Sequence, residues 1–99
     1  ELKSTTPDSY GLMQNYPNPF NSETNIKYQV AKESNVKLEI FNVLGQKIKT
    51  LVDEQKLSGY YSVKWDSKND FGSSMNSGIY FVRLVSNNFS ETKKIVLLK

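Results

Sequence analysis

The feature that most constrains this chain is a repeated alternation of apolar and polar residues along short segments. In residues 24–31, Ile26, Tyr28 and Val30 alternate with polar neighbours, and residues 36–41 and 60–66 show the same pattern. Side chains of a β-strand point to opposite faces in turn, so a period of two indicates one buried and one solvated face. No segment of helical length shows a period of 3.6. The pattern therefore predicts an all-β protein.

Four further segments complete the predicted strands. Residues 46–52 break the alternation, and Lys47 and Lys49 would protect an exposed edge, so we expect a bulged or edge strand there. Residues 78–85 are apolar on both faces, which is typical of a central strand. Residues 91–98 form the last strand, and a short first strand is expected near residues 12–15. About seven strands, spaced by about 8–12 residues, predict an antiparallel immunoglobulin-like or fibronectin-III-like β-sandwich.

The inward-facing positions of these strands define the expected core. Tyr80 follows Gly78 in the arrangement of a tyrosine corner, in which the hydroxyl bonds back to the chain, and Trp65 is the expected anchor across from it. The predicted core consists of Ile26, Tyr28, Val30, Leu38, Ile40, Val63, Trp65, Tyr80, Val82 and Leu84.

The beginning of the chain differs from the rest. Residues 1–9 are polar, contain Pro7 and show no alternation, which is typical of a linker. We expect residues 1–10 to be a linker from the upstream part of a longer parent protein, and residues 11–99 to be one domain. Residues 1 to about 9 should be mobile and open to cleavage by a processing protease. The longest apolar run, residues 95–98, is too short to cross a bilayer, so no direct membrane insertion is expected.

The amino-acid composition excludes most kinds of catalytic site. The chain has neither His nor Cys, so the commonest general base, zinc ligand and thiol nucleophile are missing, as are disulfides. The net charge is +3 and Arg83 is the only arginine, which is too mild a balance to indicate a nucleic-acid partner. We therefore expect no enzyme, no catalytic residue, no cofactor and no metal.

Two features leave binding roles open. Residues 66–72 combine acids and Asn with a glycine, but Lys68 stands where a calcium loop needs an oxygen ligand, so a turn with Asx hydrogen bonds is favoured over a calcium site. Several aromatic residues fall off the core faces and would suit stacking against sugars; they are Tyr10, Tyr16, Tyr60, Phe71 and Phe89. A structural spacer or a carbohydrate-binding module of a secreted multidomain enzyme is therefore the alternative function.

Four motifs in a fixed order carry a resemblance to a known family. They are NYPNPFN at residues 15–21, FNVLGQKI at 41–48, SGIYFVRL at 77–84 and KKIVLLK at 93–99. Together they resemble the type A C-terminal sorting domain of type IX secretion over about residues 11–99, and they are also similar to the immunoglobulin-like domain of flagellar hook-capping proteins. The matched site residues are Pro17, Asn18 and Pro19 in the proline motif, Gly45 in the turn, Gly78 and Tyr80 in the late strand, and Lys93, Lys94 and Lys99 in the basic C-terminal motif.

The resemblance implies an address for export rather than a catalyst. Such domains belong to secreted or cell-surface cargo of Gram-negative bacteria, which reaches the periplasm by means of an N-terminal signal peptide. The folded domain is recognised by the outer-membrane translocon and its shuttle protein, and a sortase-like cysteine protease commonly removes it. We expect the last strand and its lysines to be the recognised element, in which an edge strand could pair with a partner sheet through its backbone.

Overall fold

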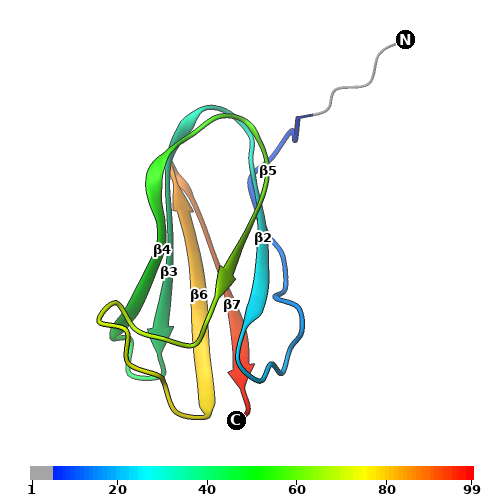
Figure 1. Ribbon diagram of the computed structural model, residues 1–99. Helices are drawn as coiled ribbons and strands as arrows, with labels where there is room; N and C mark the ends of the chain where they lie inside the picture. The colour runs from blue at the N-terminus through cyan, green and yellow to red at the C-terminus, as the bar shows by residue number, and fades with distance from the viewer. Residues whose placement is uncertain (1–5) are drawn as a thin grey trace.

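The computed structural model describes residues 6–99, which form seven strands in two antiparallel sheets. The strands are β1 (Gly11–Leu12), β2 (Thr24–Val30), β3 (Ser34–Asn42), β4 (Lys47–Lys56), β5 (Gly59–Trp65), β6 (Gly78–Ser86) and β7 (Phe89–Leu97). The order is β1-β2-β5 in one sheet and β4-β3-β6-β7 in the other, and the two sheets face each other (Figure 1). The predicted immunoglobulin-like sandwich is confirmed.

The core lies between the two sheets and follows the alternation of the sequence. Nine of the ten predicted core residues are buried, with Trp65 and Leu38 fully so. Val63 is only half-buried, because β5 is an edge strand of the three-stranded sheet. The core also contains residues that were not in the predicted set; they are Leu12, Phe20, Val36, Ile95 and Leu97.

The edge and central strands lie where the sequence predicts them. β4 is an edge strand, and its pairing with β3 shifts register between Leu38 and Glu39 and again between Ile40 and Phe41. β6 lies between β3 and β7 in the four-stranded sheet. The first strand is shorter and earlier than the predicted segment near residues 12–15, because regular pairing with β2 ends at Leu12. Beyond it, the Met13 amide donates to the Lys27 carbonyl at 3.0 Å, and Tyr16 forms an isolated bridge with Asn25.

The N-terminal segment contacts the sandwich before β1 begins. Pro7 is buried, and the Tyr10 hydroxyl shares a hydrogen bond of 2.8 Å with Ser34 while its ring stacks on Phe89 at 5.6 Å. The predicted linker over residues 1–10 therefore includes residues that pack on the domain, whereas its first five residues lie outside the described part of the chain. Among residues 6–99, no helix is long and apolar enough to cross a membrane.

Candidate functional site

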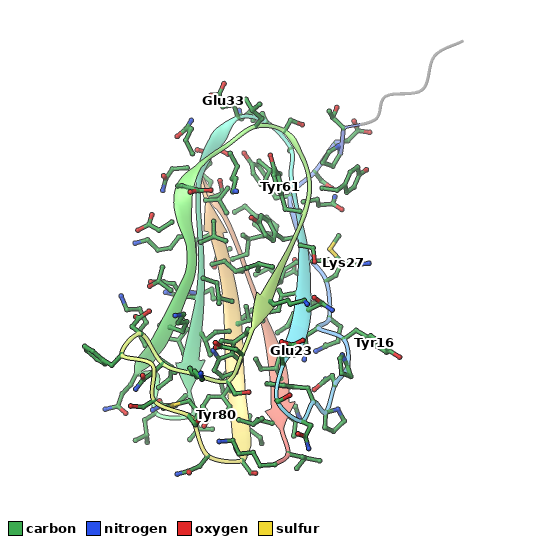
Figure 2. The ribbon with its side chains drawn as sticks, viewed as in Figure 1. Tyr16, Glu23, Lys27, Glu33, Tyr61 and Tyr80 are labelled. Atoms are coloured by element: carbon green, nitrogen blue, oxygen red, sulfur yellow. The ribbon has the colours of Figure 1, made fainter. Side chains whose placement is uncertain are left out.

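The proline motif forms part of a folded connection between β1 and β2, residues 13–23, which we call the strap. Asn15 is buried, and its side-chain amide donates to the Pro17 carbonyl at 3.1 Å and to the Thr24 hydroxyl oxygen at 3.0 Å. The Thr24 hydroxyl in turn donates to the Pro17 carbonyl at 2.8 Å. The peptide bonds that precede Pro17 and Pro19 are both cis. These contacts hold the strap against the start of β2, and Figure 2 shows Tyr16 directed away from the sandwich.

The strap also covers the outer edge of the last strand. The Asn18 side-chain oxygen accepts the amide of Val96 at 3.0 Å, and the Phe20 amide donates to the Val96 carbonyl at 2.9 Å. The Leu98 amide donates to the Phe20 carbonyl at 2.8 Å, and the Gln14 side chain donates to the Lys94 carbonyl at 2.9 Å. A partner strand therefore cannot pair with this part of β7 while the strap is in place.

Phe20 anchors the strap in the core. Its side chain is buried, and its ring lies 5.7 Å from that of Trp65, centroid to centroid. The proline motif and the C-terminal motif, which lie at opposite ends of the sequence, thus form one structural unit.

Tyr80 forms the predicted tyrosine corner. Its hydroxyl donates to the Asn76 carbonyl at 2.7 Å, and its ring meets that of Trp65 edge-on at 5.4 Å. Burial raises the pKa of the Tyr80 phenol, which keeps the hydroxyl in its donating form. Gly78 begins the same strand opposite Leu97. Tyr80 thus fixes the loop that leads into β6, which is a structural role.

Gly45 lies in a tight turn between β3 and β4. Its φ of +81° is favoured by glycine, and its amide donates to the Asn42 carbonyl at 3.0 Å. The Asn42 side-chain oxygen accepts the amides of Leu44 and Gln46, both at 3.0 Å. The turn is therefore well fixed, and it leaves the Leu44 side chain 79% exposed.

The three lysines of the C-terminal motif do not form one cluster. Lys93 and Lys94 point to opposite faces of β7; Lys93 lies 3.4 Å from Glu91, whereas Lys94 is exposed on the outer face of the four-stranded sheet. Lys99 follows the strand, and its amide donates to the Ser77 hydroxyl oxygen at 2.9 Å. The turn at Gly45, the loop before β6 and the C-terminus share one end of the sandwich, away from the N-terminal segment (Figure 1).

A comparison with known protein families identifies the family of this chain. A family described as the secretion system C-terminal sorting domain matches residues 14–98, which include three of the four motifs in full and the fourth except for Lys99. The chain is a member of this sorting-domain family. No curated protein matches it at a significant level.

Solved structures support the fold of the sorting domain. Dimeric latent PorU from Porphyromonas gingivalis superposes with a TM-score of 0.73 and 19% identity, over 98% of this chain and 10% of that one. PorZ from the same organism is described as an essential surface component of the type-IX secretion system. It superposes with a TM-score of 0.60 and 19% identity, over 93% of this chain and 12% of that one. FlgD from P. aeruginosa superposes with a TM-score of 0.58 and 20% identity, over 75% of this chain and 57% of that one. The sorting domain thus spans about a tenth of the first two chains, and these likenesses show the fold alone.

The loop that a calcium site would use is held by its own backbone. The Asn69 side-chain oxygen accepts the amides of Phe71 and Ser73, both at 2.9 Å. Asp66 accepts the Lys68 amide and Asp70 accepts the Thr50 amide, each at 3.1 Å. Across residues 6–99, the sorting domain has no group of three or more side chains that could hold a metal ion. An Asx hydrogen bond therefore accounts for Asp66, and the bond to Thr50 of β4 accounts for Asp70.

The off-core aromatic residues of the sorting domain are spread over several elements. Tyr10 and Phe89 stack on each other and tie the N-terminal segment to β7. Tyr16 is exposed on the strap, Tyr60 on β5 and Phe71 in the loop before β6. Within the described residues, these three side chains make no ring contact with one another, with Tyr10 or with Phe89.

Two polar residues of the strap were not among the predicted site residues. Gln14 ties the strap to β7, and Asn15 folds it back on Thr24. An Asn two positions before a proline, followed by Thr at the start of an alternating segment, is the signal that could have pointed to Asn15.

Proposed function

We propose that this sorting domain is a non-catalytic export address for a larger protein joined to its N-terminal side. The cargo first reaches the periplasm of a Gram-negative bacterium and then crosses the outer membrane by type IX secretion, to the cell surface or the medium. The observation that carries this proposal is the family match over residues 14–98, which covers the strap from Gln14 onward, the Gly45 turn, the tyrosine corner and β7.

The proposed partners are the outer-membrane translocon with its shuttle protein and a sortase-like cysteine protease that separates cargo from address. The contacts that join the strap to β7 support recognition of the folded domain, because they bring the proline motif and the C-terminal motif together. The N-terminal segment lies at the opposite end from the C-terminal motif, which leaves the cargo clear of it (Figure 1).

The experiment that tests this function places a signal peptide and a folded reporter before the 99-residue chain in a bacterium with an active type IX system. We expect the reporter in the medium or on the cell surface, and the same reporter without the domain in the periplasm. Equal periplasmic retention of both proteins would contradict the proposed function.

A further inference from the structure

The backbone of the last strand is a poor target for a partner. The carbonyl of Lys94, both polar backbone groups of Val96 and the amide of Leu98 already bond to the strap. Phe20, which holds the strap there, is buried in the core against Trp65. Recognition of residues 94–98 in the folded domain therefore has to use side chains.

The available side chains lie on the outer face of the four-stranded sheet. Ile95 and Leu97 point into the core, so Lys94, Val96 and Leu98 point outward. By register, Phe81 of β6 lies opposite Lys94, and Ile79 lies opposite Val96. Phe41 of β3 lies opposite Phe81 in turn. We call this surface the docking face; it consists of Phe41, Ile79, Phe81, Lys94, Val96 and Leu98.

The docking face is unusually apolar for the exposed side of a sheet. Ile79 is 42% exposed and Leu98 is 54% exposed, while Phe41, Phe81 and Val96 are half-buried. Scattered single apolar side chains are ordinary on protein surfaces, whereas contiguous apolar patches with a polar rim mark interaction sites.

A hollow adjoins this face beside the Gly45 turn. Its volume is about 310 Å³, and its lining includes Phe41, Val43, Phe81 and Arg83. The Arg83 guanidinium lies 4.8 Å from the centre of the Phe41 ring, at the border of the hollow. A concave site of this kind can receive a large apolar side chain from a protein more readily than it can receive a flat lipid surface.

The charges around the docking face are cationic. Within residues 6–99, neither Arg83 nor Lys94 has an ion pair, and Glu39, the acid opposite Arg83 on β3, is 8% exposed and lies 3.8 Å from Lys47. A partner that covers the apolar face would place its own carboxylates against these two cations.

We infer that the docking face binds a partner protein segment that carries a large apolar side chain flanked by carboxylates. The inference rests on the proposed function, because it assigns the surface by which the export machinery recognises the folded domain. In this binding mode the partner recognises the outward side chains of β6 and β7, and no strand of the partner pairs with the backbone of β7.

A charge reversal tests the inference in the reporter fusion described above. Lys94→Glu should lower export about tenfold or more, because a carboxylate would then face the partner's carboxylates. Lys27→Glu is the matched control, since Lys27 is an exposed strand lysine on the three-stranded sheet (Figure 2), and export should stay unchanged. Thermal melting of both purified variants should match that of the parent domain.

The outcomes separate this inference from the proposed function. Normal export of Lys94→Glu, or an equal loss for Lys27→Glu, would overturn the docking face and leave the sorting function standing. Failure of the parent fusion to be exported would remove the sorting function and the inference with it.

A photoreactive amino acid identifies the kind of partner. Placed at Thr92, which lines the hollow, it should crosslink to a protein in exporting cells, and Lys94→Glu should reduce that adduct. Placed at Ser62 on the other sheet, it should give no such adduct. A lipid adduct at Thr92, or a protein adduct that Lys94→Glu does not weaken, would overturn the inference.

Discussion

The backbone amide of Val96 donates a hydrogen bond to the side chain of Asn18 over 3.0 Å, which joins residues 78 positions apart in the sequence. The proline motif and the basic C-terminal motif therefore depend on each other for their structure. A variant in either motif can reduce export simply because the last strand is no longer held, so effects on folding and on recognition have to be measured separately.

The first prediction concerns this bond. Asn18→Ala removes the acceptor of the Val96 amide, and it should lower the free energy of unfolding by about 0.5–1.5 kcal/mol. Denaturant unfolding checks the value. Asn21→Ala, an exposed asparagine of the same strap, should stay within about 0.5 kcal/mol of the parent domain. Equal stability of the two variants would show that Asn18 does not hold β7.

The second prediction concerns the aromatic anchor of the strap. Phe20→Ala should lower the free energy of unfolding by about 3–5 kcal/mol, because it opens a cavity beside Trp65 and releases the strap. Phe71→Ala is the control, since Phe71 is 92% exposed and its loss should cost less than about 0.5 kcal/mol. A small effect of Phe20→Ala in calorimetry would contradict the anchoring role.

The third prediction concerns pH and the tyrosine corner. Tyr80→Phe removes the hydrogen bond to Asn76 and should cost about 1 kcal/mol near neutral pH. Burial raises the pKa of Tyr80 in the folded state, so the contribution of its hydroxyl is complete below the unfolded pKa of about 10 and is lost as the pH rises through the folded value.

Melting curves from neutral pH to above pH 10 check the third prediction. The gap in stability between the parent domain and Tyr80→Phe should narrow as the pH rises, since the variant has no phenol to ionise at this position. Tyr16→Phe, on an exposed side chain, should show no gap at any pH. If the stability difference between the parent domain and Tyr80→Phe widened as the pH rises, the role assigned to the Tyr80 hydroxyl would be contradicted.

The sheet architecture could be predicted from the sequence because its cause is local. Alternation fixes which side chains of β2, β3 and β6 are buried, and the apolar run of β6 reflects its central position. The burial of Val63 was overestimated, because alternation shows which face of a strand a side chain lies on but not whether the strand is at the sheet edge. Phe20 and Gln14 lie outside any alternating segment, so their contacts with β7 depend on tertiary packing alone.

The candidate site could be predicted only in part. The motifs supplied the candidate residues, and the sequence grouped Lys93 with Lys94, whereas the structure places their side chains on opposite faces of β7. The pairing of Phe41, Phe81 and Lys94 across three strands requires the register of β3, β6 and β7, which sequence patterns do not fix. These residues therefore became visible as one surface only in the structure.

The fourth prediction concerns metal binding. Calcium should leave the melting temperature of the domain unchanged, because the loop of Asp66, Asn69 and Asp70 uses its side-chain oxygens to hold backbone amides. Calorimetry with calcium and with a chelator checks this. A native-state ligand raises the midpoint, so a calcium-dependent rise would overturn the prediction.

The central claim is that this domain directs export by type IX secretion, and its most direct test is the location of a fused reporter in matched strains. The measurement is the fraction of reporter that external protease digests on intact cells or that appears in the medium, compared between a strain with a complete translocon and one that lacks it. We predict an exposed or released reporter in the first strain and a protected periplasmic reporter in the second. The same location in both strains would contradict the claim.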